Sequence, residues 1–244
     1  MNILTYGESI AVAIYKIADM KIKYETKSTY ILKKLQPYII EDKEYDYEVI
    51  VSEDDINYER SLTDESGMDI LESAALFRHI CKNVLKSYNG IFLHCAALRY
   101  NDKAYLFTAP SGTGKTTHIR LWMKNLGDRV EVINGDKPIL RKKGDDIIVY
   151  GTPWQGKENY GSNISAKLGG IFLLSRGAEN SVEKAPVKDL LAFLLSQTLR
   201  PNEKEDMIKL FEVLEFIVGN IPIYHLKCNM ENQAVQTALS VIDK

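Results

Sequence analysis

Cysteine is scarce in this sequence, and its placing excludes two kinds of site. The 244 residues include only Cys81, Cys95 and Cys228, and no two of them form a Cys-x-x-Cys pair. An odd number does not suit a disulfide framework, and the missing pair leaves no zinc-binding pattern. We therefore expect a protein of the reducing cytoplasm without a structural zinc ion.

Long apolar runs and an excess of one charge are also missing. No apolar stretch approaches the roughly 18 residues that a membrane-spanning helix needs, and the N-terminal residues show no secretory signal. The net charge of −2 gives no electrostatic support for a nucleic-acid partner. We expect a cytoplasmic protein that has neither a membrane nor a nucleic acid as its partner.

Glycine is not abundant either, but two glycines stand in the most informative stretch of the chain. Residues 109–117 read Ala-Pro-Ser-Gly-Thr-Gly-Lys-Thr-Thr, which matches the phosphate-binding pattern G-x-x-x-x-G-K-[ST] with Ala109 in place of the first glycine. An apolar β-prone segment precedes this glycine loop (residues 109–117), and a helical apolar pattern follows it. That order places a helix N-terminus behind a phosphate. The predicted nucleotide-binding residues are Ser111, Gly112, Thr113, Gly114, Lys115, Thr116 and Thr117.

The loop predicts ATP and Mg²⁺ as cofactors. Lys115 is expected at the β- and γ-phosphates, and the Thr116 hydroxyl is expected on Mg²⁺. Asp136 follows the strand predicted over residues 129–133, where a carboxylate linked to Mg²⁺ belongs, although a plain turn residue is the alternative. Thr116 and Asp136 are therefore the predicted metal ligands.

Four further polar residues are candidates with an open alternative. His94 lies in the apolar run 91–98, where a core histidine and a site residue are both consistent with the pattern. Lys157 lies in a long glycine-rich loop, residues 151–163, which is either a binding loop, as long loops of this kind often are, or an ordinary surface loop. Arg176 and Arg200 stand at the ends of predicted elements, where each is either a phosphate or substrate contact or an ordinary solvated arginine.

The first 65 residues predict a small β-rich region of short strands and turns, followed by a larger domain over residues 66–244. Residues 41–65 include eleven acidic and two basic residues, a net charge of −9. This acidic segment is either a solvated face or a docking surface for a basic partner. In the larger domain the periodicity predicts helices over 68–88, 187–199, 203–218 and 231–242, hairpins over 91–108 and 139–150, and strands over 168–174 and 221–226.

The stretch from His94 to Asp136 resembles the catalytic core of the HPr kinase/phosphorylase family. His94 lies 17 residues before Ser111, and Asp136 lies 21 residues after Lys115, which is similar to the family's arrangement of histidine, phosphate loop and acid. The loop is also similar to that of ATP-dependent phosphoenolpyruvate carboxykinase, which shares the kinase fold. Segments 134–140, 151–154 and 226–230 resemble a bacterial subgroup of HPr-kinase-related proteins, some of which phosphorylate a serine on a ribosomally made peptide.

The resemblance implies an α/β fold with some α+β character: a phosphate-loop core of mixed β-sheet with flanking helices. It implies an ATP-dependent serine kinase acting on a peptide or protein, with Asp136 as general base, His94 assisting and Lys115 on the phosphates. It also implies a homo-oligomer. Gly135 stands where the family has a further acid. Two alternatives therefore stay open: a kinase of a free amino acid or other small alcohol, and a nucleotide-binding regulatory protein with little turnover.

Overall fold

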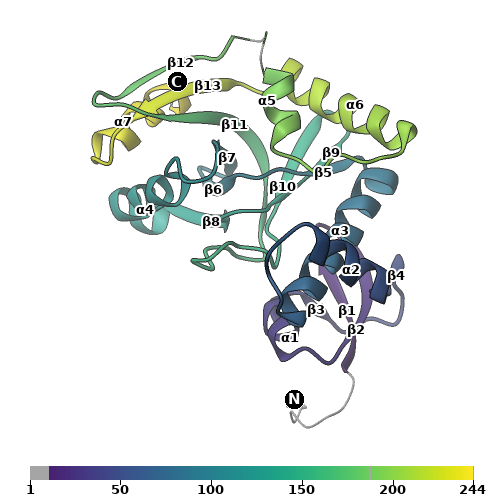
Figure 1. Ribbon diagram of the computed structural model, residues 1–244. Coiled ribbons are helices and arrows are strands. Elements are labelled where there is room, and N and C mark those ends of the chain that lie inside the picture. Colours follow the sequence, from purple (N-terminus) through teal and green to yellow (C-terminus); the bar gives the residue numbers. More distant parts are fainter. Residues whose placement is uncertain (1–10, 187, 189, 244) are drawn as a thin grey trace. The chain divides into compact units, whose positions relative to one another are not determined.

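The chain forms two compact units, Met1–Ile80 and Cys81–Lys244, in a computed structural model that describes residues 11–186, 188 and 190–243 (Figure 1). The division falls within helix α3 (Met68–Tyr88), whose bounds agree with the helix predicted from the sequence. The first ten residues of the predicted β-rich region lie outside the described residues, and the domain boundary after residue 65 stays a prediction. None of the described helices combines the length and the apolar character needed to cross a membrane.

The first unit is built on a four-stranded sheet in the order β3-β1-β2-β4. Its strands are β1 (Ala11–Ile17), β2 (Met20–Thr26), β3 (Ile39–Ile40) and β4 (Tyr47–Val49). A two-residue turn at Ala18 and Asp19 joins β1 to β2, and both residues have positive φ, which matches the twist of a hairpin. The helical elements are α1 (Thr29–Leu35), η1 (Gln36–Tyr38), α2 (Glu53–Ser61) and the start of α3.

Helices α1 and α2 lie in the region that the sequence predicted to be strands and turns, so that prediction was wrong there. Helix α2 is rich in acidic residues, and Ile56 is its only buried apolar residue. Its sequence therefore shows no repeat of apolar residues at helical spacing. The helix is set instead by its first turn. The Ser52 side chain caps the amide of Asp55 while the Asp55 carboxylate accepts from the amide of Ser52, which makes a capping box.

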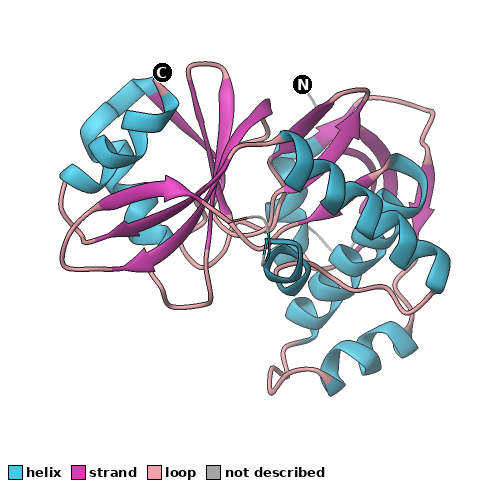
Figure 2. Ribbon diagram, turned by 90° about the horizontal axis from the view of Figure 1, so that it is seen from above, coloured by secondary structure: helices cyan, strands magenta, loops and turns pink. Residues whose placement is uncertain are grey.

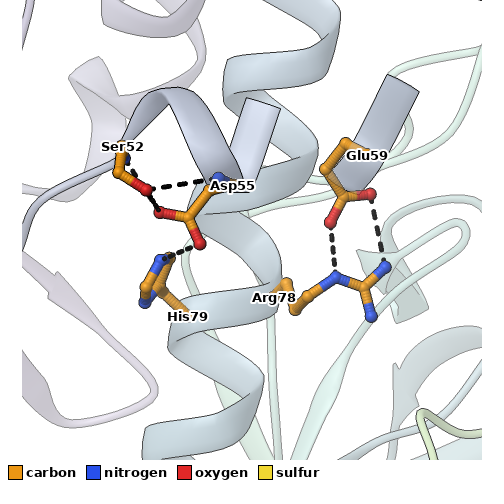
Figure 3. Close-up of polar contacts among 5 residues, drawn as sticks. All are labelled: Ser52, Asp55, Glu59, Arg78 and His79. Atoms are coloured by element: carbon orange, nitrogen blue, oxygen red, sulfur yellow. Dashed lines mark hydrogen bonds and ion pairs between the residues drawn. The ribbon is translucent and has the colours of Figure 1, made fainter. Parts of the chain in front are cut away.

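An ion pair and a histidine–carboxylate contact tie α2 to α3 within the first unit (Figure 3). Arg78 donates through two nitrogens to both carboxylate oxygens of Glu59, which is buried, and His79 Nε2 lies 3.2 Å from Asp55 Oδ1. Bidentate pairing of this kind fixes orientation as well as distance. Part of the acidic segment therefore stabilises the fold of this unit, and its role as a docking surface stays a prediction.

The second unit is built on a nine-stranded mixed sheet, with the path β5-β9-β10-β11-β7-β6-β8 and with β13 and β12 added beside β11. Its strands are β5 (Gly90–Phe92), β6 (Ala96–Tyr100), β7 (Lys103–Thr108), β8 (Val130–Asn134), β9 (Ile139–Lys143), β10 (Asp146–Tyr150), β11 (Ser165–Arg176), β12 (Ser181–Lys184) and β13 (Ile223–Cys228). The long strand β11 pairs in parallel with β7 and β13 and antiparallel with β10.

Helices cover both faces of this sheet, as Figures 1 and 2 show. On one face Leu98 and Phe107 share a core with Trp122 of α4 (Lys115–Leu126), and α7 (Gln233–Ile242) contributes to the same core. On the other face Leu106 shares a core with Leu210 of α6 (Lys204–Asn220), and α5 (Leu190–Ser196) joins it. Alternate residues of β6 and β7 therefore face opposite helical layers. Residues 187 and 189 of the helix predicted over 187–199 lie outside the described part of the chain.

The parallel strands β7, β11 and β13 end at one edge of the sheet. Their register pairs Thr108 with Leu173, and Arg176 with Cys228. In open α/β sheets ligands bind outside the carboxyl ends of parallel strands. The glycine loop follows β7 at this edge, so the fold puts the sequence's strongest motif where a ligand site is expected. The predicted mixed sheet with flanking helices is confirmed as an architecture.

Candidate functional site

The glycine loop joins β7 to α4, as the sequence predicted. Gly112 and Gly114 have φ values of 79° and 126°, which favour glycine, and a Cβ at either position would meet open space. The first turn of α4 holds no acidic residue, and its N-cap makes no side-chain hydrogen bond. The positive end of the helix is therefore free to attract an anion, and the loop is shaped to approach one.

Lys115 is folded into the loop rather than extended into solvent. Its side chain is buried, and Nζ donates to the carbonyl oxygen of Ala109 over 2.9 Å. Burial lowers the pKa of Lys115, and the negative charge of Asp136 partly opposes that effect. The amine is thus held beneath the loop. An anion bound there would stabilise the positive charge that burial disfavours.

Arg176, at the end of β11, contacts the carbonyl side of the glycine loop. Its Nη2 donates to the carbonyl oxygen of Gly112 over 2.6 Å, and its Nε donates to that of Thr113 over 3.1 Å. The structure therefore gives this arginine a loop-bracing position. The phosphate contact predicted for it stays a prediction.

The predicted continuous strand over residues 91–98 is interrupted, and the interruption exposes His94. The amide of His94 donates to the carbonyl of Gln197 over 2.7 Å, and the amide of Cys95 donates to the carbonyl of Asp136 over 3.1 Å. Neither amide therefore forms a hydrogen bond of the strand ladder. The chain leaves the sheet here because these partners replace the strand ladder. The His94 side chain is then half-buried, with Nε2 at 3.2 Å from Asp136 Oδ1.

The charge of Asp136 is set by opposing effects. Burial opposes ionisation of its carboxyl group, but the hydrogen bond from His94 and the positive charges of Lys137 and Lys115 outweigh it. The pKa of Asp136 is therefore below its ordinary value. Asp136 is a carboxylate at neutral pH, as a metal ligand or a proton acceptor has to be.

Asn134 organises the turn that carries Asp136, a role that no pattern in the sequence indicated. Its fully buried side chain accepts from the amides of Asp136 (2.9 Å) and Lys137 (2.7 Å). Its amide group donates to the carbonyl and the hydroxyl of Thr152, at 3.1 and 3.0 Å. Because one amide side chain satisfies four partners, the position of the acid is fixed against the start of the 151–163 loop.

Gly135, which directly precedes Asp136, is held by the same loop. Its amide donates to the carbonyl of Tyr160 over 2.7 Å. A Cβ at this position would lie 2.9 Å from the carbonyl oxygen of Gln155 and 3.1 Å from that of Tyr160. Both oxygen atoms belong to the backbone, so no side-chain rotation can relieve the close contact. The packing of this loop therefore selects glycine over an acid at position 135.

Gly135→Ala is expected to destabilise the chain by about 1–3 kcal/mol, because a methyl group would force the loop backbone apart. Thermal unfolding by circular dichroism measures the effect. The matched control is Gly219→Ala, since a Cβ at Gly219 meets nothing within 4 Å. Equal melting temperatures for the two variants would contradict the close approach at Gly135.

Two cavities flank the glycine loop, and they share Gly112 and Gly114. The first, of about 380 Å³, is lined by His94, Ser111, Gly112, Gly114, Lys115, Thr116, Ile119, Gly135, Asp136, Gln155, Gly156, Lys157, Glu158 and Tyr160. The second, of about 460 Å³, is lined by Gly112, Thr113, Gly114, Thr117, His118, Leu121, Leu174, Ser175, Arg176, Gly177, Cys228, Asn229 and Met230.

Most of the predicted site residues meet at these cavities. His94, Asp136, Lys115 and Lys157 line the first, and Arg176 lines the second. Arg200 is exposed and lines neither cavity. The fold thus brings residues together that lie far apart in the sequence, with the glycine loop between the two groups.

Glu158 and Tyr160, which line the first cavity, are bound by a residue that the sequence did not single out. Arg120, on α4, forms an ion pair with Glu158 at 2.7 Å and donates to the Tyr160 hydroxyl over 3.3 Å. This contact ties the 151–163 loop to the helix that follows the glycine loop. In the sequence, only the glycine and aromatic content of residues 151–163 indicated that this loop contributes to a site.

Thr116 and Asp136 fit a magnesium ion that also binds phosphate oxygens. Both line the first cavity, and their oxygen atoms are of the kind that Mg²⁺ prefers. Among the described residues there is no cluster of three or more histidine, cysteine or acidic side chains that would hold a metal alone. Mg²⁺ commonly keeps several waters and takes one or two protein ligands plus phosphates, which is the arrangement these two residues allow.

Comparison with known proteins gives little beyond this geometry. No protein-family model matches the chain, and no curated protein matches it. Among solved structures, the Hpr(Ser) kinase/phosphatase from Coxiella burnetii aligns with 62% of this chain and 94% of its own, at 13% sequence identity and a TM-score of 0.33. A likeness this weak does not define a function, so the function has to come from the residues of the site.

Proposed function

We propose that this protein is an ATP-dependent kinase that transfers the γ-phosphate to a hydroxyl group, the serine of a peptide or protein being the acceptor that the sequence favours. One observation carries the proposal. The buried amine of Lys115 and the paired side chains of His94 and Asp136 line one cavity beside a loop shaped for an anion. Phosphoryl transfer requires positioning and charge neutralisation, and this cavity offers both.

Each residue has a distinct part in the proposed reaction. The loop amides and Lys115 hold the phosphates, and Thr116 with Asp136 would hold Mg²⁺, which neutralises phosphate charge when bound. The acceptor oxygen attacks the γ-phosphorus, the bond to the bridging oxygen of ADP breaks, and Asp136 takes the hydroxyl proton. His94 orients the carboxylate through Nε2. With glycine at position 135, one carboxylate serves both as a metal ligand and as a base.

The test is phosphate transfer from labelled ATP and Mg²⁺ by the purified protein. The acceptor panel contains serine peptides, proteins, free serine and simple alcohols. Free serine belongs in it because a free amino acid is the alternative acceptor that the sequence leaves open. We expect label on a hydroxyl group. Label on free serine alone would replace a macromolecular acceptor with a small one.

A second candidate function is nucleotide binding with little turnover. The observation that favours it is the close packing around Gly135, which excludes a second acid from the site. ATP binding without label transfer across the whole panel would support this regulatory function over the kinase.

The pairing of His94 with Asp136 predicts a measurable pKa change. His94→Ala removes the hydrogen bond that lowers the Asp136 pKa and leaves the burial that raises it, so the pKa of Asp136 should increase. Carbon-13 NMR titration of the carboxyl group measures this. In the wild type the stabilisation from Asp136 is present above the ordinary value of 3.8 and is lost as pH falls through the lower folded value. In the variant the folded value is higher, so this stabilisation is smaller and its loss is complete at a higher pH.

The matched control is His225→Ala, because His225 is an exposed histidine on β13 and lines neither cavity. It should leave the titration of Asp136 unchanged. An unaltered Asp136 pKa in His94→Ala would show that the two side chains do not interact in solution.

A further inference from the structure

Two peptide groups of the glycine loop are held in one orientation by very little within the loop itself. They join Thr113 to Gly112 on one side and to Gly114 on the other. Glycine adopts more backbone conformations than any other residue, and a Cβ at either glycine would meet nothing within 4 Å. Among the described residues, the two groups make one backbone hydrogen bond, from the Thr113 amide to the Pro110 carbonyl over 3.3 Å. A group outside the loop therefore has to set their orientation.

Arg176 is in the position to do so. Its Nη2 donates to the Gly112 carbonyl over 2.6 Å, and its Nε donates to the Thr113 carbonyl over 3.1 Å. Its backbone is fixed at the end of β11, where it pairs with Cys228 of β13, and the next amide, that of Gly177, donates to the Cys228 carbonyl over 3.1 Å. Because the guanidinium is a rigid planar fork, its two bonds fix both carbonyls relative to one another.

The same two bonds determine where the amide hydrogens point. In a trans peptide group the carbonyl and the N–H point in opposite directions, and the described chain contains no cis peptide bond. The amides of Thr113 and Gly114 therefore point away from the guanidinium. A carbonyl that accepts a hydrogen bond from a cation also makes the N–H of its own peptide group a better donor. Arg176 thus leaves polarised donors on the opposite side of the loop.

The helix that follows the loop adds further donors. The first hydrogen bond along α4 runs from the His118 amide to the Gly114 carbonyl over 2.9 Å. The amides of residues 115–117 precede it and so have no partner within the helix. An anion at this helix N-terminus meets those amides together with the Gly114 amide that Arg176 orients. The guanidinium is on the carbonyl side of the loop, so it does not contact the same anion.

We propose that Arg176 is a positioning residue, which sets the phosphate affinity of the glycine loop by orienting its peptide groups and stays on the two carbonyls when phosphate binds. This inference rests on the proposed function, since it requires a phosphate on the loop. The effect acts on any phosphate chain, with or without a nucleoside. Movement of Arg176 onto the phosphate, the contact predicted from the sequence, is the opposing outcome of the test.

The experiment measures binding of ATP and of inorganic tripolyphosphate, each with Mg²⁺, to wild type, Arg176→Met and Arg176→Lys. Both substitutions remove the planar fork, so each variant should bind both ligands about tenfold or more weakly than wild type. A direct phosphate contact gives a different order, because lysine keeps the positive charge and only Arg176→Met would lose affinity. Arg129→Met and Arg129→Lys are the controls, since Arg129 is exposed between α4 and β8.

A measurement on the wild type does not depend on how the variants fold. The NMR coupling across the hydrogen bond between Arg176 Nε and the Thr113 carbonyl carbon should be present in the free protein and persist with tripolyphosphate bound. Loss of this coupling on binding, or wild-type affinity in either Arg176 variant, would overturn the positioning role and leave the kinase proposal standing. Failure of wild type to bind either tripolyphosphate or ATP would overturn both.

Discussion

Asp136→Asn is expected to slow phosphate transfer by about 10²- to 10⁴-fold, the usual contribution of a positioned general base, while ATP binding persists. The reason lies in the site. Asn134 fixes the backbone of Asp136, and the carboxylate lies 3.2 Å from His94 Nε2 in the cavity that contains Lys115. The amide keeps the shape and the acceptor oxygen of the side chain, but it cannot take a proton at neutral pH.

The measurement is single-turnover transfer to the acceptor found in the panel, together with an ATP titration of the same protein. Asp145→Asn is the control, because Asp145 is exposed in the turn between β9 and β10. Full transfer by Asp136→Asn would remove Asp136 from the role of base. Loss of ATP binding along with transfer would assign it mainly to the metal.

Lys115→Met should weaken ATP binding by about 100-fold or more, because charge-assisted hydrogen bonds to phosphate are among the strongest that a side chain makes. Methionine retains most of the buried stem, so the change removes charge with little loss of packing. In the wild type the amine already lies under the loop, bonded to the carbonyl of Ala109, so little reordering is needed for it to reach a phosphate.

Isothermal titration with ATP and Mg²⁺ measures that effect, and Lys124→Met on the exposed face of the same helix is its control. Tripolyphosphate should lose affinity in parallel, since the contact is with phosphate. Undiminished binding by Lys115→Met would show that the glycine loop is not the nucleotide site.

The elements that the sequence predicted best are those with a strong local pattern. Helix α3 has a broad apolar face, and its bounds agree with the prediction. The strand, loop and helix around residues 103–126 also follow local rules, because glycine conformations and helical spacing act within a few residues. The hairpin of β6 and β7 turns at Asn101 and Asp102, both with positive φ, as that residue pair suggests.

What the sequence could not predict depends on contacts between distant segments. His94 leaves the sheet because its amide donates a hydrogen bond to the carbonyl of Gln197, which is far along the chain. The wall that selects Gly135 comes from Gln155 and Tyr160. The bonds from Arg176 to the glycine loop join residues that are 63 and 64 positions apart. No local period in the sequence encodes these contacts.

The bonds around Asn134 also bear on the chemical lifetime of the protein. An Asn-Gly pair is prone to deamidation, in which the glycine nitrogen attacks the side-chain amide and ammonia leaves. Here the Gly135 nitrogen donates to Tyr160, and four hydrogen bonds hold the Asn134 amide in place. The native fold therefore restrains the two groups that would have to react. The carboxylate that deamidation creates at this position would face the carbonyl oxygen of Thr152. The repulsion between them would disturb the turn that carries Asp136.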